Sequence, residues 1–299
     1  AENIKSNIDG GVFLLQGASS VTLSKSKFRD CKAQRHGGFA HITEGSSLYV
    51  QNSLISDTKA KVYGGFVYMS GASVLSLQKA EIESTLAQVG GALYIGGAGS
   101  RVEGDGSSKF VNAAAIDSGG GVYADDEGFA HLSGFTIENA RANLGAGVYL
   151  SNGNYSLENV YVIRGAAATF GGGYYIKNAR LSIQGGYVGR SSAESGGGIM
   201  ATENSILMTA ASFLLSNNTA NKGGGLTVER GSKAVLSGQT VINYCRAKDG
   251  AGIWLSGQSM ILIERRSIIS DCSATNQGGG VMVVDESSAK IHESSILRN

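Results

Sequence analysis

A glycine-rich unit followed by an apolar run recurs eleven times along the chain and constrains its fold more than any other feature. Repeats of 20 to 50 residues are typical of solenoids, in which each repeat packs only on its neighbours. The last glycines of the units lie 25 to 30 residues apart, which predicts about eleven coils of about 27 residues. These glycines are Gly11, Gly38, Gly65, Gly91, Gly121, Gly147, Gly173, Gly198, Gly225, Gly252 and Gly280.

The segments between the glycine units have the composition and alternation of β-strands. Each repeat contains an apolar run such as 12–15, an alternating segment such as 21–23, and a short apolar segment such as that at Phe28. The 299 residues include 45 glycines and no proline, and the apolar spacing of an amphipathic helix is missing. Glycine pairs inside the repeats also disfavour helical repeats of similar length. The sequence therefore predicts an all-β solenoid with three short strands per coil.

An alanine a few residues before each glycine unit, from the second unit onward, provides an independent marker of the same period. The two markers run in step, which predicts that Gly38, Gly65, Gly91 and their equivalents stack along one corner. The alanines are Ala33, Ala60, Ala87, Ala115, Ala142, Ala168, Ala193, Ala220, Ala247 and Ala274.

The alternating segment and the run after the glycines differ in the faces that they bury. Pairs such as Val21 and Leu23, or Leu181 and Ile183, bracket one residue and are predicted to point inward. In the run after the glycines, three consecutive positions are apolar in nearly every coil. Successive side chains of a strand point to opposite faces, so either phase leaves an apolar column outside.

This outer column predicts a contact face, because large exposed apolar patches mark contact sites. Three occupants fit it: another part of the same protein, a neighbouring rod or other protein, and a carbohydrate stacked on its aromatic rings. The residues assigned to the face are Phe13, Leu15, Ile42, Val67, Met69, Leu93, Ile95, Tyr123, Tyr149, Tyr175, Met200, Trp254 and Met282.

The three cysteines share one column of the repeat. Cys31, Cys245 and Cys272 each lie two residues before one of the marker alanines. Cys245 and Cys272 belong to consecutive coils, and a separation of about 4.8 Å falls within the Cα range of a disulfide. Because side chains in register run parallel, two buried free thiols are the favoured interpretation and a disulfide is the alternative. No histidine accompanies them, so a zinc site is not predicted.

No group of residues predicts catalysis. Asp125, Asp126 and Glu127 share one turn, but the equivalent turns of the neighbouring coils carry no acid. Glu203 and Glu229 nearly stack, and Arg230 beside Glu229 indicates a solvated ion pair. We therefore expect no enzymatic activity, no metal and no cofactor. The alternative is a carbohydrate-active β-helix, a lyase or hydrolase with a polysaccharide-binding role.

The net charge and the hydropathy of the chain limit the classes of partner that it is expected to bind. The 25 basic and 24 acidic residues leave a net charge of +1, so no long-range field favours nucleic acid. No apolar stretch approaches the length of a membrane-spanning helix, and no membrane insertion is expected. One basic group near the start is either a solvated edge or a site for an acidic polymer. It comprises Lys25, Lys27, Arg29, Lys32 and Arg35, with Lys59 and Lys61 one coil on.

Short motifs resemble the tandem Gly-Gly-Ala-Ile and Phe-x-x-Asn units of polymorphic outer-membrane proteins, and protist surface β-helix proteins look similar. The motifs are Gly-Gly-Ala-Leu at 90–93, Gly-Gly-Gly-Ile at 196–199, Phe-Val-Asn at 110–112 and Ile-Leu-Arg-Asn at 296–299. The resemblance implies a right-handed parallel β-helix that is exposed on a cell surface and used in adhesion or assembly.

These observations predict an extracellular or cell-surface scaffold with a structural or adhesive function. Two sequons, at Asn154 and Asn217, are acceptors for N-glycosylation in a eukaryotic secretory route. Residues 1–299 are expected to form a single β-helix segment that is uncapped at both ends and cut from a longer protein. The expected partners are another protein, through self-association or further segments of the parent protein, and glycans.

Overall fold

The computed structural model describes residues 1–125 and 129–299. All regular elements among the described residues are β-strands, which confirms the all-β class. No helix in this part of the chain is long or apolar enough to span a membrane. The chain divides into two compact units, unit 1 at residues 1–149 and unit 2 at residues 150–299.

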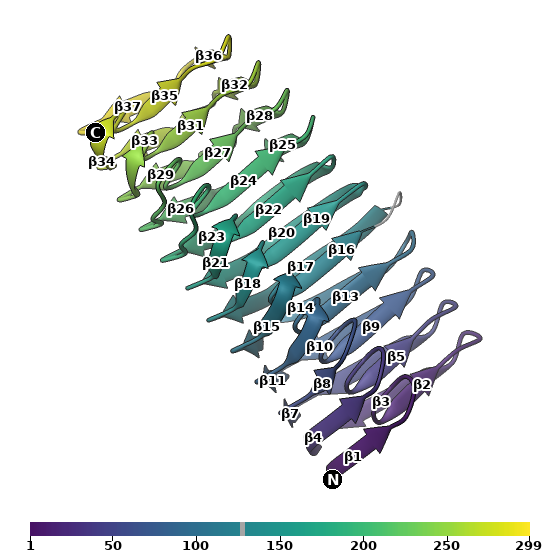
Figure 1. The fold of residues 1–299 in the computed structure, drawn as a ribbon. Coiled ribbons are helices and arrows are strands. Elements are labelled where there is room, and N and C mark those ends of the chain that lie inside the picture. Colours follow the sequence, from purple (N-terminus) through teal and green to yellow (C-terminus); the bar gives the residue numbers. More distant parts are fainter. Residues whose placement is uncertain (126–128) are drawn as a thin grey trace. The chain divides into compact units, whose positions relative to one another are not determined.

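Unit 1 consists of short strands that pair in parallel with their equivalents one coil away (Figure 1). The strands are β1 (Glu2–Ser6), β2 (Phe13–Leu15), β3 (Ser20–Ser24), β4 (Lys27–Ala33), β5 (Ala40–Ile42), β6 (Ser47–Gln51), β7 (Leu54–Ser56), β8 (Lys59–Ala60), β9 (Val67–Ser70), β10 (Val74–Gln78), β11 (Glu81–Glu83), β12 (Leu86–Val89), β13 (Leu93–Gly96), β14 (Arg101–Val111), β15 (Ala114–Ser118), β16 (Val122–Asp125), β17 (Phe129–Glu138) and β18 (Arg141–Leu144). Strand β19 (Val148–Ser151) spans the unit boundary.

Unit 2 repeats the same parallel arrangement. Its strands are β20 (Asn154–Ile163), β21 (Ala166–Phe170), β22 (Tyr174–Lys177), β23 (Arg180–Gly189), β24 (Ile199–Thr202), β25 (Ile206–Thr209), β26 (Phe213–Ser216), β27 (Leu226–Val228), β28 (Lys233–Leu236), β29 (Val241–Asn243), β30 (Arg246–Asp249), β31 (Ile253–Leu255), β32 (Met260–Ile263), β33 (Ile268–Ser270), β34 (Ser273–Gln277), β35 (Val281–Val283), β36 (Ser288–Ile291) and β37 (Ser295–Leu297).

One coil of unit 1 runs through β9, β10, β11 and β12 and returns to β13, where Leu93 pairs with Val67. The sheet that receives one strand from every coil has eleven strands, so the predicted solenoid of about eleven turns is confirmed. The structure adds a short fourth strand to this coil, beyond the three predicted per coil. That strand, like β8 one coil earlier, carries the marker alanine, and Ala33 pairs with Ala60 and Ala87 with Ala115.

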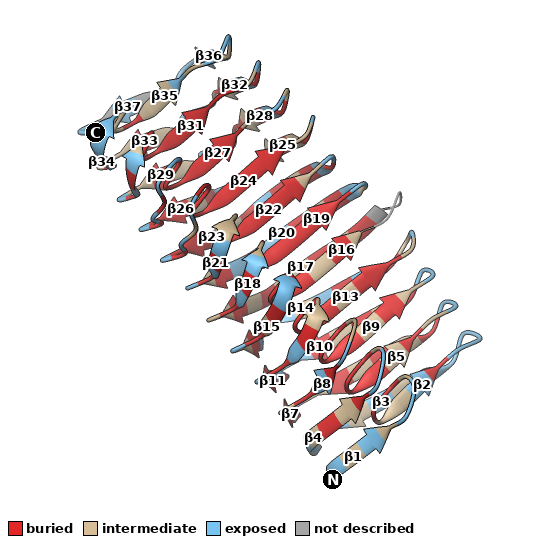
Figure 2. Ribbon diagram, viewed as in Figure 1, coloured by how far each residue is buried: buried red, intermediate tan, exposed pale blue. Residues whose placement is uncertain are grey.

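The core follows the predicted alternation. Leu48, Val50, Leu181 and Ile183 are fully buried, as their inward assignment requires. The eleven-stranded sheet, which follows the glycine units and runs from β2 through β9 and β13 to β35, is called the glycine-adjacent sheet. Figure 2 shows its strands largely buried and the loop tips exposed. In unit 1 a row of phenylalanines fills the core, with ring centroids of Phe39 and Phe66 5.4 Å apart. The interior of each unit is thus mainly apolar, with buried hydroxyl groups such as those of Thr209 and Thr227 on its strands.

The glycine corner allows the coils to approach closely. Gly90 has a φ of +66°, in the left-handed region that glycine tolerates best. Gly91 lies under the next coil, and a Cβ atom there would be 2.2 Å from the carbonyl oxygen of Gly120. Gly38 and Gly65 have the same relation to the coils that follow them. The predicted stack of Gly38, Gly65 and Gly91 is therefore confirmed.

The stack continues differently from the prediction, because Gly91 meets Gly120 and not Gly121. The amide of Ala92 donates to the carbonyl of Gly121 at 3.1 Å. Ala92 of the fourth coil is therefore the equivalent of Gly121, the third glycine of the fifth coil. Phe39 and Phe66 occupy this place in earlier coils. An alignment of the coils on their last glycine therefore places the first four coils one residue out of register with the later coils.

We predict that Gly91→Ala lowers the free energy of unfolding by about 3 kcal/mol, because its methyl group would lie 2.2 Å from the Gly120 carbonyl oxygen and 2.4 Å from that of Ala114, so the backbone of the next coil must shift. Gly106→Ala is the control. Gly106 has a φ of +82° with nothing within 4 Å of the added carbon, so only the backbone strain of about 1–2 kcal/mol is expected. Urea denaturation followed by circular dichroism measures both, and equal losses would contradict the clash.

Candidate functional site

A column of outward-facing side chains runs along the glycine-adjacent sheet of unit 1. Strand pairing places His41 beside Tyr68, and Tyr68 beside Tyr94, while the flanking Val67 and Met69 point into the core. We call this column the tyrosine ladder. Its members are Leu14, His41, Tyr68, Tyr94, Tyr123 and Tyr149.

The rings of the tyrosine ladder stack on one another. Centroid distances are 5.1 Å from Tyr68 to Tyr94, 5.2 Å from Tyr94 to Tyr123 and 4.7 Å from Tyr123 to Tyr149. The corresponding planes are within 7° to 16° of parallel. Because each ring covers the face of its neighbour, the ladder presents ring edges and hydroxyl groups to its surroundings.

A second column, five residues earlier in each coil, packs beside the ladder. Tyr63 stacks on Tyr94 with centroids 4.4 Å apart, and His36 stacks on Tyr63 at 4.9 Å. The backbones of His36 and Tyr63 form a parallel bridge, so this column repeats with the coils. The two columns hold the rings of Tyr68 and Tyr94 in place, and both side chains remain half-buried.

The structure corrects the first part of the predicted contact face. Leu15, Ile42, Val67, Met69, Leu93 and Ile95 point inward and are buried, and the half-buried Phe13 belongs to the same inward column as Val67. The cause is the one-residue shift of the first four coils, since a shift of one position moves a strand's side chains to the opposite face. Leu14, His41, Tyr68 and Tyr94 take their place. The recurrence of tyrosine every 26 to 29 residues from 68 to 175 was the sequence signal for this column.

In unit 2 the outward column is assigned correctly but is largely covered by the chain itself. Tyr175, Met200 and Trp254 are 6%, 1% and 9% exposed. The neighbouring column lies against them: Phe170 stacks on Tyr175, and the Lys222 ammonium lies 4.9 Å from the centre of the Trp254 ring. Met282 is half-buried. These residues therefore do not form an open face. Tyr149, 8% exposed, is covered as well, so Tyr123 is the one residue of the predicted face in unit 1 that is both outward and half-buried.

A charged group closes the first-coil end of the tyrosine ladder. The Arg35 guanidinium donates to the Asp9 carboxylate at 2.6 Å, and the backbone N–H of His36 donates to the same carboxylate at 3.2 Å. Nδ1 of His41 lies 3.6 Å from an Asp9 oxygen, too far for a hydrogen bond. The two imidazoles are 6.1 Å apart and nearly perpendicular.

The environment of this group shifts its ionisation. Burial lowers the pKa of His36 and of His41 below the usual 6.5, although the negative charge of Asp9 acts in the opposite direction. Burial opposes ionisation of Asp9, but the Arg35 hydrogen bond and the histidine charges outweigh it, so the pKa of this carboxyl is lowered. The folded state therefore favours neutral histidines beside an ionised Asp9.

We predict that acid destabilises this end of unit 1. The unfolded chain binds protons at His36 and His41 more readily than the folded chain, so the stability present above pH 6.5 is lost as the pH falls below that value toward the lower folded pKa. The double variant His36→Gln, His41→Gln should have a flatter dependence of unfolding free energy on pH between 7 and 5. Urea titrations at several pH values measure this slope, and an unchanged slope would contradict the assignment.

The cysteines are free and buried. Burial raises the pKa of the Cys31 thiol to about 11. The pKa of Cys245 is raised by a hydrogen bond with the Cys272 thiol and by burial. The Cys245 and Cys272 sulfurs also approach the carbonyls of Asn243 and Ser270, each at 3.4 Å. The same hydrogen bond between the two thiols lowers the pKa of the Cys272 thiol. The structure thus shows the favoured interpretation, two neighbouring buried thiols that are free.

The two nearly stacked acids of unit 2, Glu203 and Glu229, are held in ion pairs. Glu203 lies 3.5 Å from the Lys177 ammonium and 3.7 Å from the Arg230 guanidinium. Arg230 also pairs with Glu229 at 3.5 Å, as the sequence indicated. Asp125 accepts a hydrogen bond from the Tyr123 hydroxyl, whereas Asp126 and Glu127 lie outside the described residues. Within the described ranges, no three His, Cys, Asp or Glu side chains are grouped so that they could hold a metal ion.

Both sequon asparagines are exposed. Asn154 begins β20, and Asn217 has a left-handed φ of +57° just after β26. The middle residues of the two sequons, Tyr155 and Asn218, are buried, so the two acceptor side chains project from ordered backbone.

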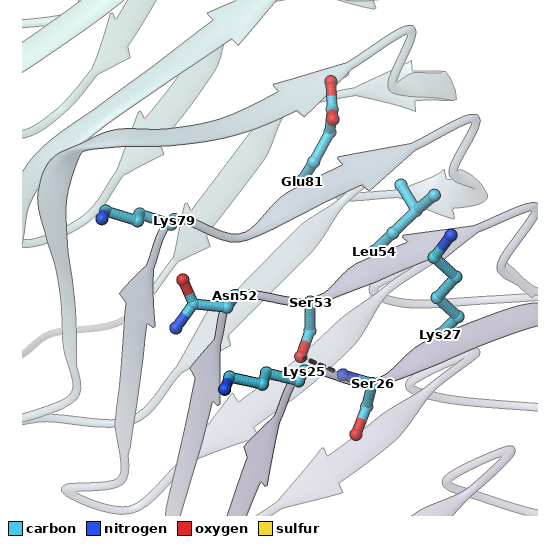
Figure 3. A pocket seen from close by; sticks show the side chains of 8 residues that line it. All are labelled: Lys25, Ser26, Lys27, Asn52, Ser53, Leu54, Lys79 and Glu81. Atoms are coloured by element: carbon cyan, nitrogen blue, oxygen red, sulfur yellow. Dashed lines mark hydrogen bonds between the residues drawn. The ribbon is translucent and has the colours of Figure 1, made fainter.

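A cavity of about 350 Å³ lies beside the basic group of unit 1 (Figure 3). Lys25, Asn52 and Lys79 extend from three successive corners, each with a left-handed φ of 47° to 49°. The amide of Ser26 donates to the Ser53 hydroxyl at 3.0 Å and links two of these corners. Apart from Leu54, the lining side chains are polar or charged.

The parallel coils and their stacked columns define the chain as a parallel β-helix protein. The family model for the right-handed β-helix region matches residues 98–296, about two thirds of the chain. The chain therefore belongs to the right-handed β-helix family. Comparisons with curated proteins and with solved structures gave no match.

Proposed function

We propose that this protein is a structural or adhesive β-helix scaffold, extracellular or on a cell surface, that associates with another protein through the tyrosine ladder of unit 1. The observation that carries the proposal is the unbroken column of half-buried, stacked aromatic rings from Tyr68 to Tyr123. Tyrosine is enriched at protein interfaces because it combines a large apolar body with a polar tip.

Preorganisation supports a contact role for this column. The rings of Tyr68 and Tyr94 are held by stacking within the ladder and on Tyr63, so little side-chain freedom is lost on association. Leu14, at the first-coil end, is 54% exposed and extends the apolar surface. A second copy of the chain is the simplest partner, because its ladder has the same coil spacing of about 4.8 Å.

A protein partner fits the ladder better than a stacked carbohydrate does. A sugar would need free ring faces, and in unit 1 the faces of Tyr94 and Tyr123 are covered by neighbouring rings. In unit 2, Lys222 lies over the Trp254 ring. A carbohydrate-active function has no comparable observation in its favour.

The extracellular location is supported by the sequence motifs and by the exposed sequons. The chain resembles polymorphic outer-membrane and protist surface proteins in its short tandem motifs, and its two sequon asparagines are exposed. If the protein passes through a eukaryotic secretory route, glycans at Asn154 and Asn217 would lie on unit 2, away from the ladder of unit 1 in sequence.

We predict that the wild-type chain self-associates and that Tyr68→Glu with Tyr94→Glu weakens the association about 30-fold or more. Truncating or charging a central interface aromatic costs about 2 kcal/mol or more. Sedimentation velocity over a concentration series measures the change. Tyr161→Glu with Tyr244→Glu is the matched control, since these tyrosines are 36% and 53% exposed elsewhere on the chain and should leave association unchanged.

Thermal melting of both double variants separates loss of association from loss of fold. If the wild-type chain is monomeric throughout, or if the ladder variant associates as the wild type does, the proposed ladder interface is wrong.

We also expect no turnover of acidic or neutral polysaccharides, with or without calcium, because Glu203 and Glu229 are held in ion pairs. Reducing-end and unsaturated-product assays test this. Cleavage that disappears in Asp125→Asn or Glu203→Gln would replace the scaffold proposal with the carbohydrate-active alternative.

A further inference from the structure

A column of lysines stands in register on the face of unit 1 formed by β1, β4 and β8. Lys5 pairs with Lys32, and Lys32 pairs with Lys59. Like charges on adjacent strands about 4.8 Å apart repel each other, so this arrangement is unfavourable unless an anion relieves it. Lys32 is neutralised by Asp30. Among the described residues, no carboxylate forms an ion pair with Lys59 or with Lys61 two residues along the chain.

The column becomes apolar at the next coil. Leu86 pairs with Lys59 and is 37% exposed. In the coil after that, the register between β12 and β15 shifts by one residue, and the Gln88 amide donates to Asp117 at 2.6 Å. The shift places Ile116 and Asp117 opposite Gln88 in a β-bulge, and Ile116 is 62% exposed, the most exposed large apolar side chain of the described residues. Bulges commonly redirect a side chain toward a site.

These side chains surround a cavity of about 340 Å³, separate from the polar cavity at Lys25 and Lys79. Lys32, Lys59 and Lys61 line it together with the apolar Leu86, Ala87 and Ile116. Its volume lies at the lower end of the range for small-molecule sites, about 300–1,000 Å³. The Asp30 carboxylate attracts Lys5 and Lys59 as well as Lys32, but it forms its ion pair with Lys32. The cavity therefore combines positive charge with an apolar wall.

We propose that this cavity binds a small organic anion with an apolar tail, of which a medium-chain alkyl carboxylate is the simplest example. The carboxylate lies between the ammonium groups of Lys59 and Lys61, and the alkyl chain lies on Leu86 and Ile116. Charge complementarity selects the headgroup, and burial of the exposed Leu86 and Ile116 surfaces selects the tail. The site is independent of the tyrosine ladder.

Isothermal titration calorimetry with sodium octanoate, sodium acetate and 1-octanol tests the two halves of the site. We expect saturable one-to-one binding of octanoate, with acetate and octanol at least tenfold weaker. Lys59→Gln with Lys61→Gln, and separately Leu86→Ser with Ile116→Ser, should each weaken octanoate binding at least tenfold. The four substituted side chains line the cavity and none lies in the core. Thermal melting verifies that each variant folds.

The matched control is Lys25→Gln with Lys79→Gln, which removes the same charge from the polar cavity and should change octanoate affinity by less than twofold. Equal losses in the two lysine variants would show general electrostatic attraction and overturn the site. Octanol binding as tight as octanoate binding, or no saturable binding of octanoate, would do the same. Binding to phosphatidylserine vesicles without binding of free octanoate would assign the lysines to a membrane surface instead.

Discussion

The parallel, in-register hydrogen bonding between successive coils is the constraint on which every other feature of this structure depends. It brings each residue within about 4.8 Å of its equivalent in the next coil. At the glycine corner this leaves little room for a side chain, and Gly38, Gly65 and Gly91 meet the carbonyl of the following coil. The same column holds alanine at Ala146 and Ala251, so the corner accepts nothing larger than a methyl group in the coils described.

The same register turns every position of the repeat into a column, and in several columns similar residues stack on one another. Where the residues attract each other, the column is a source of stability: Phe39 packs on Phe66, and the Asn139 side chain donates to Asn112 at 3.2 Å. Stacked tyrosines extend this principle to the outside of unit 1. The lysines at 5, 32 and 59 are the opposite case, because a charged column repels itself. The ladder and the lysine column thus show the two outcomes of stacking on the surface of unit 1, attraction between aromatic rings and repulsion between like charges.

Much of the fold was predictable from single residues and their spacing. The glycine and alanine markers gave the coil number and period, and the alternation at Leu181 and Ile183 gave the inward face of the middle strand. The contact face was only half predictable. Phe39 and Phe66 stand where later coils have a third glycine, so the last glycine is not the same structural position throughout. Because of this one-residue difference, the prediction assigned Met69 and Ile95 to the outer face of the strand. Both side chains are buried in the structure.

The residue pattern alone predicted the parallel solenoid, because a period of about 27 residues with strand alternation and paired glycines favours stacked β-coils over helical repeats. Only the tertiary structure decided which columns are accessible. Trp254 and Tyr94 occupy equivalent outward positions, yet Trp254 is covered by Lys222 whereas Tyr94 remains half-buried. Likewise, a bulge that exposes Ile116 beside Lys59 and Lys61 depends on how β12 meets β15. The exposure of a side chain depends on neighbours from other coils and from other sides of the same coil. A repeat pattern specifies which residues stack on one another, but it does not specify which side chains cover them.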